Sequence, residues 1–267
     1  MNFADMAVMT TAWRRPYYFE QVLNSWANAD GVDDLRRFVI SLGPTDRHDQ
    51  QLTLIRRMRP RFGVDLEILP QSDAAVRGDG RRVPFGPHRA IAEAIDHVFT
   101  DPAVQFVVAG EEDVLVSSDT LTYMRWAAGK FEGDPQVLAV CAHNQHGQGW
   151  DKPGPADDED ADQNAVRLLP YFSPWCWGTW RDRWEKILEP EWDYNCDSGG
   201  DLDSGYDWNV QARILPRHSM TCAVPDASRS QNIGAQEGWA STPQIVGQAQ
   251  SLSFRRDRDD PAYRMET

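Results

Sequence analysis

The chain has 267 residues, of which 41% are hydrophobic, and its formal net charge is −14 with no cluster of Lys or Arg. This length and composition predict one large α/β domain or two small ones with a sizeable core, and they exclude a disordered chain. The acidic balance argues against a surface that tracks nucleic-acid phosphates and against adhesion to an anionic membrane, while leaving room for a local basic pocket.

The chain carries no recognisable targeting segment. Met1 to Met9 has no basic stretch followed by an apolar one, so we expect no secretory signal there. No apolar run reaches the length of a membrane span. The cysteines are widely spaced and match no zinc pattern: Cys141, Cys176, Cys196 and Cys222. We therefore expect reduced thiols in a cytoplasmic protein.

The first half of the chain alternates between short apolar runs and segments with helical spacing. The runs predict strands at Ala7–Ala12, Phe38–Leu42, Val64–Leu69 and Phe106–Ala109. The spacing predicts helices at Tyr17–Ala27, Asp49–Met58 and His88–Phe99, with a polar, basic loop at Gln71–Pro87. Strands that alternate with helices predict βαβ units and a mostly parallel sheet.

Acidic residues follow the last of these strands. The apolar run that ends at Ala109 leads into Glu111, Glu112 and Asp113, and a helix-like segment follows Asp119. Open α/β sheets bind ligands at the carboxyl ends of their strands. Carboxylate oxygens at this place suit Mg²⁺ or Mn²⁺, which in turn suits a diphosphate. The alternative is a solvated acidic turn.

The second half has a different composition. Val137–Cys141 is expected to be a strand, and Asp151–Gln163 is a loop rich in Asp, Pro and Gly that we expect to be exposed and to move over the site. Tryptophans then become frequent: Trp175, Trp177, Trp180, Trp184, Trp192 and Trp208. Because aromatic rings bury large areas, the first interpretation is a core; the alternative is a platform for a sugar or a base.

The order of these segments resembles a GT-A-fold glycosyltransferase of the N-acetylglucosaminyltransferase I type. The resemblance is carried first by the opening strand and turn and by the acidic motif: Thr11–Tyr17, His88–Arg89, Glu111–Val114 with Asp119, and Cys141–Gly147. It continues in the second half: Trp175–Trp177, Arg181–Trp184, Tyr206–Trp208, and Pro225–Arg229 with Gly234. The chain departs from the family pattern in three places: Cys141–Gly147 keeps only part of its segment, Glu112 replaces an Asp, and Cys176 replaces the Gly before Trp177.

The resemblance implies a fold in which one half binds the donor and the other half binds the acceptor. It implies a single GT-A catalytic domain, Rossmann-like, with a mostly parallel sheet flanked by helices over residues 1–267. Residues 1–119 would form the nucleotide-sugar-binding half and residues 120–267 the acceptor-binding half. The activity would be a metal-dependent, inverting transfer of a hexosyl or N-acetylhexosaminyl group, with a UDP-sugar as the leading donor class and Mn²⁺ or Mg²⁺ as cofactor.

Site residues follow partly from the resemblance and partly from chemistry. Asp113 is expected to hold the metal, and the expected substrate-binding residues are Arg15, His88, Glu111, Glu112, Asn144, Trp177 and Arg229. An arginine at the end of the first strand suits a nucleotide or its phosphates, and Arg229 has a structural salt bridge as its alternative role. Asp207 lies between two aromatic residues, which favours a general base with a raised pKa. Its competitors are Asp197, Asp201 and Asp203.

Two other functions stay open. A sugar nucleotidyltransferase would share the nucleotide and metal chemistry, but it usually has a Gly-rich, Lys-bearing loop after the first strand, where Trp13-Arg14-Arg15 stands. A non-catalytic nucleotide-sugar or carbohydrate-binding protein is the second alternative. The acceptor would be a polysaccharide, a protein or a small molecule, and the acidic balance makes a nucleic-acid acceptor less favoured.

Overall fold

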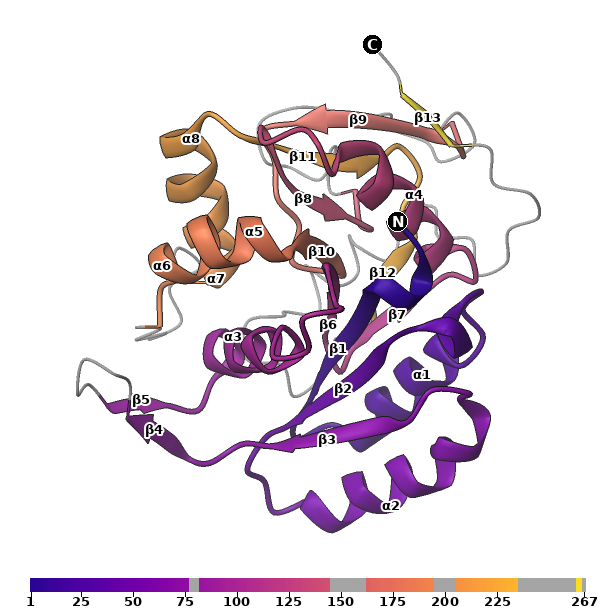
Figure 1. Ribbon diagram of the computed structural model, residues 1–267. Coiled ribbons are helices and arrows are strands. Elements are labelled where there is room, and N and C mark those ends of the chain that lie inside the picture. Colours follow the sequence, from indigo (N-terminus) through magenta and orange to yellow (C-terminus); the bar gives the residue numbers. More distant parts are fainter. Residues whose placement is uncertain (77–81, 145–161, 195–204, 235–262, 266–267) are drawn as a thin grey trace.

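A nine-stranded sheet forms the centre of the protein, with the order β13-β9-β11-β8-β10-β6-β1-β2-β3 (Figure 1). The computed structural model describes residues 1–76, 82–144, 162–194, 205–234 and 263–265. The strands of this sheet are β1 (Met6–Ala12), β2 (Arg37–Leu42), β3 (Leu66–Pro70), β6 (Phe106–Gly110), β8 (Val137–Cys141), β9 (Ala165–Leu169), β10 (Trp177–Trp180), β11 (Thr221–Pro225) and β13 (Arg264–Met265).

Helices cover both faces of the sheet. The longer ones are α1 (Pro16–Trp26), α2 (His48–Met58), α3 (Pro87–Val98) and α4 (Thr120–Phe131). The shorter helical segments of the second half are α5 (Arg181–Arg183), η4 (Trp184–Leu188), α6 (Glu189–Glu191), α7 (Tyr206–Asn209), η6 (Val210–Ile214) and α8 (Leu215–His218). Short 3₁₀ turns are η1 (Phe3–Asp5), η2 (Val32–Asp34) and η3 (Arg59–Arg61). Among the described residues, no helix is long and apolar enough to cross a membrane.

Two hydrophobic cores lie on the two faces of the sheet. Along β1, Met6 and Val8 belong to the core beneath α1, α2 and α4. Their neighbours Ala7 and Met9 belong to the core that α3 and the helical segments of the second half cover. Successive side chains of a strand point to opposite faces, so a strand with a core on each face must be apolar throughout. This is why the first strands were visible as continuous apolar runs.

The strands of the first half are parallel, as expected. β1 lies between β2 and β6, with Thr10 opposite Gly110 on one side and opposite Ile40 on the other. The expected helices are present with small shifts at their ends, and the α/β class with a mostly parallel, helix-flanked sheet is confirmed. Because the strands are parallel, their carboxyl ends meet at one edge of the sheet.

The second half departs from a simple parallel sheet. β10 lies between β6 and β8 and is antiparallel to both, and β9 is antiparallel to β11. No strand was predicted at β9, β10 or β11, and the four residues of β10 show no alternation of polar and apolar side chains. Strands from both halves of the chain therefore join in one sheet.

Two small sheets complete the fold. The segment expected as a loop from Gln71 to Pro87 contains a hairpin of β4 (Ala74–Val76) and β5 (Arg82–Pro84), which projects from the body (Figure 1). A second pair joins β7 (Val114–Val116) to β12 (Ser230–Asn232) in antiparallel fashion. This pair places β12, from the second half of the chain, beside the strand that directly follows Glu111, Glu112 and Asp113. The expected mobile loop lies almost entirely outside the described residues.

Candidate functional site

The carboxyl ends of β1 and β6 bring a cation and two carboxylates together. Arg15 Nε lies 2.8 Å from Glu112 Oε1, and Arg15 Nη1 lies 2.8 Å from Asp113 Oδ2. The second oxygen of Glu112 accepts a hydrogen bond of 2.6 Å from the backbone amide of Trp13. Pro16 begins α1 directly after Arg15, which fixes the turn that presents the guanidinium. We call Arg15, Glu112 and Asp113 the ionic cluster.

Burial makes the charges of the ionic cluster depend on one another. Burial disfavours the charged form of Arg15, but the carboxylates of Asp113 and Glu112 outweigh it and raise the pKa of the guanidinium. The Asp113 side chain is 3% exposed, and burial raises the pKa of its carboxyl while the charge of Arg15 opposes that rise. Removing the arginine would leave two carboxylates without a counter-charge.

The end of β12 passes directly over Asp113. The amide of Ile233 donates a 2.8 Å hydrogen bond to the backbone carbonyl of Asp113. At the next residue, Gly234, an added Cβ would collide with Asp113 Oδ2 and would lie 2.7 Å from Arg15 Nη1. The backbone at Gly234 approaches these two side chains so closely that a Cβ would have to displace them.

The residues of the ionic cluster fit a divalent ion held by a single protein oxygen. Among the described residues, no group of three or more His, Cys, Asp or Glu side chains is arranged to hold a metal. Within that same part of the chain, however, the buried Oδ1 of Asp113 has no hydrogen-bond partner. Both oxygens of Glu112 are already engaged. A hard ion bound mainly by the phosphates of its ligand and by water would need only the Asp113 oxygen from the protein.

Glu111 faces a different set of neighbours. Its Oε1 accepts a hydrogen bond of 2.7 Å from the hydroxyl of Tyr206, which comes from α7 in the second half. Burial and the nearby charge of Asp113 raise the pKa of Glu111 to about 8, with a further contribution from Asp207, although the bond from Tyr206 opposes the rise. Glu111 therefore keeps its proton near neutral pH and lies within electrostatic reach of both aspartates.

Asp207 is a partly buried carboxyl at the start of α7. Burial raises its pKa, and hydrogen bonds from the backbone amides of Trp208 and of Asp207 itself work against the rise. A carboxylate with a raised pKa at the edge of a site has the chemistry of a general base. Its competitors from the sequence lie outside the described residues: Asp197, Asp201 and Asp203.

His88 and Trp177 belong to a cluster of aromatic rings around Tyr206, the residue that bonds to Glu111. Trp192 lies between Trp177 and Tyr206, nearly parallel to both, at 6.4 Å and 5.3 Å between ring centroids. His88 meets Tyr206 edge to face at 5.7 Å, and its backbone carbonyl accepts a hydrogen bond from Trp192 Nε1. The ring of Trp177 is fully buried, so in this structure it has the contacts of a core residue and not those of an exposed platform.

Arg229, expected to bind substrate, has contacts that fit its alternative structural role. Its side chain is fully buried, and Nε lies 3.2 Å from Asp119 Oδ2. The guanidinium lies 4.7 Å and 5.0 Å from the ring centroids of Tyr123 and Tyr263, two rings that meet each other edge to face. It also donates to two backbone carbonyls, those of Ala227 and Gln163. With these partners Arg229 fastens the segment before β12 to α4, and none of its bonds goes to the ionic cluster.

Asn144 fastens the same segment from the other side. Its side-chain amide donates 2.9 Å to the carbonyl of Asp226, and its backbone amide donates to Ser228 Oγ. The neighbouring His143 is fully buried, and its Nδ1 lies 3.0 Å from the carbonyl of Ser230 on β12. The segment that carries Gly234 over Asp113 is thus held in place by Asn144 and His143.

Sequence reasoning missed Tyr206 and Trp192 as parts of this site. Their signal was weak, because a Tyr next to Asp207 and one more Trp among many are also what a core would contain. At Cys176, which stands where the resembling family has Gly, the backbone adopts φ 66°, the left-handed conformation that favours glycine. A cysteine thus occupies a backbone conformation that favours glycine.

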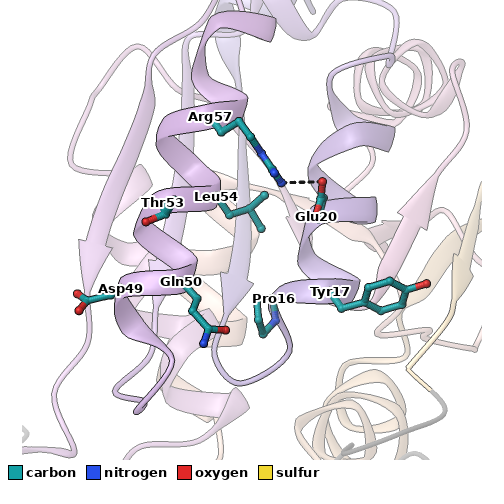
Figure 2. A pocket seen from close by; sticks show the side chains of 8 residues that line it. All are labelled: Pro16, Tyr17, Glu20, Asp49, Gln50, Thr53, Leu54 and Arg57. Carbon is teal, nitrogen blue, oxygen red and sulfur yellow. Dashed lines mark ion pairs between the residues drawn. The ribbon is translucent and has the colours of Figure 1, made fainter.

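A separate groove of about 510 Å³ lies between α1 and α2. Figure 2 shows Leu54 between the two helices and Pro16 at the lower end, with an ion pair of 2.6 Å between Arg57 and Glu20 crossing above. Tyr17 extends away from α2, and its side chain is exposed. The charged pair of this groove is open to solvent, unlike the buried ionic cluster, so the groove is not the candidate site.

No protein-family model matches the chain. Among solved structures, the chain is similar to a mannosyltransferase from Pyrobaculum calidifontis in complex with GDP-Man and Mn²⁺, with a TM-score of 0.51 and 18% identity over 88% of this chain and 58% of that one. It is also similar to TarS of S. aureus, residues 1–349, with a TM-score of 0.54 and 12% identity over 96% of this chain and 67% of that one. The same protein in complex with UDP gives 0.52 and 14%, over 86% and 60%.

These similarities establish the fold. At such identities they show that the central sheet and its flanking helices have the GT-A arrangement of these glycosyltransferases. They do not single out the N-acetylglucosaminyltransferase I type, since the neighbours are of other kinds. The chain spans between about half and two thirds of the length of these structures.

Proposed function

We propose that the chain is a glycosyltransferase that moves a sugar from a nucleotide-sugar donor to a hydroxyl acceptor. The observation that supports it best is that two carboxyls from different halves of the chain, Asp113 and Asp207, both come close enough to Glu111 to raise its pKa, while Tyr206 beside Asp207 bonds to Glu111 directly. Asp113 is buried at the end of β6 with one unused oxygen, and Asp207 is partly buried at the start of α7. The two positions suit the two tasks of the reaction, the release of a diphosphate and the removal of a proton.

The donor end is proposed at the ionic cluster. Arg15 would give the diphosphate a charge-assisted contact, and Glu112 would hold the guanidinium in place through its bonds to Arg15 and to the backbone of Trp13. A bound Mn²⁺ or Mg²⁺, held by Asp113, would supply Lewis-acid stabilisation of the leaving diphosphate. A UDP-sugar is the leading donor, because one solved structure with this fold is a complex with UDP; GDP-Man, present in another, is the second.

The acceptor end is proposed around Asp207, as the base of an inverting transfer. In a one-step displacement the base must lie on the face of the sugar opposite the diphosphate, where it takes the proton of the acceptor hydroxyl. A carboxylate whose pKa is raised by burial is a stronger base than a solvated one. Residues 1–119 would thus serve the donor and residues 120–267 the acceptor, a polysaccharide, a protein or a small molecule.

Binding of UDP and GDP, measured by calorimetry with Mn²⁺ and with chelator, tests the donor end. We expect one nucleotide to bind far better with Mn²⁺, and Asp113→Ala to lose most of that difference. Equal nucleotide affinity with and without Mn²⁺ would refute the proposed role of the metal. If neither nucleotide nor its sugar derivatives bind, the proposed function is refuted.

Turnover separates the proposed function from its alternatives. Asp207→Asn should lower transfer by about 10²–10⁴-fold while metal-dependent donor binding stays nearly intact, and the product should have inverted anomeric configuration. A sugar nucleotidyltransferase would instead release pyrophosphate from a nucleoside triphosphate and a sugar phosphate. A binding protein would hold the donor and show no transfer with any hydroxyl acceptor.

A further inference from the structure

One side chain joins the two proposed halves at the point where the reaction would occur. The hydroxyl of Tyr206, on α7, donates to Glu111 Oε1 at 2.7 Å across 95 positions of sequence. The ring is buried, stacks on Trp192 at 5.3 Å and meets His88 edge to face. The hydroxyl also lies 3.4 Å from the carbonyl of Pro174, a longer contact than the one to Glu111. Tyr206 therefore has a fixed orientation, set by packing around its ring and chiefly by the short hydrogen bond to Glu111 at its tip.

Tyr206 and Asp207 lie in the first turn of a longer helical stretch. α7 continues directly into η6 and α8, so the stretch reaches His218. Its N-cap residue, Gly205, has no side chain that could cap it, and the first amides of a helix have no acceptor within the helix. The first turn therefore takes its stability from tertiary contacts. Asp207 immediately follows Tyr206, so the position of its carboxyl is tied to the position of the tyrosine.

We infer that Tyr206 is a positioning residue that sets Asp207 against the ionic cluster through its hydrogen bond to Glu111. This inference rests on the proposed function in one respect, namely that Asp207 is the base. Glu111 directly follows β6, the strand that ends at the ionic cluster. A bond from Tyr206 to Glu111 therefore fixes the position of the base relative to the residues that would hold the donor. The hydroxyl itself contacts no reacting atom in this role.

The test is the effect of Tyr206→Phe in three backgrounds. In the otherwise unchanged chain we expect kcat to fall about 10- to 100-fold, because small misplacement of a catalytic group is enough for such a loss, while KM for the donor changes little. With Glu111→Gln the amide oxygen still accepts the bond, so Tyr206→Phe should again lower kcat. With Glu111→Leu only the longer contact to the Pro174 carbonyl remains, so Tyr206→Phe should lower kcat much less than in the other two backgrounds.

Two results would overturn the inference. One is an equal effect of Tyr206→Phe in all three backgrounds, because the hydroxyl would then act independently of Glu111. The other is a loss confined to donor affinity with kcat unchanged. The matched control is Tyr17→Phe, which removes a hydroxyl from a side chain that is 74% exposed and should leave kcat as it is.

A second readout keeps this test separate from the proposed function. Amide exchange at residues 206–210 of the free protein should become faster in Tyr206→Phe and in Glu111→Leu, by the same factor, and not in Glu111→Gln or Tyr17→Phe. If the wild-type chain transfers no sugar, the proposed function fails while this experiment still shows whether Tyr206 anchors α7. Unchanged exchange in both Tyr206→Phe and Glu111→Leu would refute the anchor directly.

Discussion

Breaking the ion pair between Asp119 and Arg229 should destabilise the fold without touching the donor end. The two side chains are 1% and 0% exposed. Asp119→Ala would leave a buried guanidinium with backbone carbonyls and two aromatic rings but no carboxylate, and the hydroxyls of Ser117 and Tyr263 would each lose one acceptor. Removing one partner of a buried pair costs about 3–5 kcal/mol, which is a large share of a total stability of about 5–15 kcal/mol.

Urea and thermal unfolding followed by tryptophan fluorescence measure this loss. For a chain of this size we expect Tm to fall by roughly 6–20 °C. Arg167→Ala is the control, because its pair with Asp226 has a half-exposed arginine and should cost about 1 kcal/mol or less. Donor affinity per folded molecule should be unchanged in Asp119→Ala.

Arg229→Met separates the two roles of this arginine. We expect it to destabilise the fold, since it leaves the Asp119 carboxyl buried without its cation, and to leave donor binding intact in the folded fraction. A folded Arg229→Met protein of wild-type stability that no longer binds the donor would refute this reasoning, because Arg229 would then be a substrate-binding residue.

Three further outcomes are expected. Gly234→Ala should weaken donor binding at least tenfold in calorimetry, because its Cβ would displace Asp113, whereas Gly133→Ala, where a Cβ meets open space, should not. His143 is buried with its pKa lowered to about 4 from 6.5, so its contribution to stability is complete above pH 6.5 and is lost as pH falls toward 4; the difference in unfolding free energy between wild type and His143→Gln should shrink over that window. Glu111 has its pKa raised to about 8 from 4.5, so the folded state loses stability as pH rises from 4.5 to 8, and Glu111→Gln should gain on wild type across that range in urea titrations. If the difference in unfolding free energy between wild type and one of these two variants does not change with pH, the pKa shift assigned to that residue is wrong.

The sequence was most informative where a local pattern was sufficient. β1, β2, β6 and β8 are buried on both faces, so their apolar runs could be recognised directly. β10 could not, because its four residues acquire their strand character from pairing with β6 and β8, which are distant in the chain. The periodicity of a sequence indicates which residues are buried, but it says little about which distant segment pairs with a given strand.

The residues of the candidate site were likewise predictable only where a local pattern was sufficient. Arg15, Glu112 and Asp113 follow two adjacent strand ends, so parallel pairing predicts that they meet, and the structure places them within 2.8 Å. The partner of Arg229 lies 110 positions away in the chain, and nothing local distinguishes a buried arginine from one that binds a phosphate. The bond from Tyr206 to Glu111 was hidden for the same reason.

The position of β10 also affects how the protein is made. Because β10 fills the space between β6 and β8, a nascent chain that ends before Trp177 presents the edge of β6 with no neighbour on that side. Unpaired apolar edges invite pairing between molecules. Such long-range closure also makes folding slow, since the connecting chain must first be ordered. The donor half is therefore expected to aggregate when it is expressed alone.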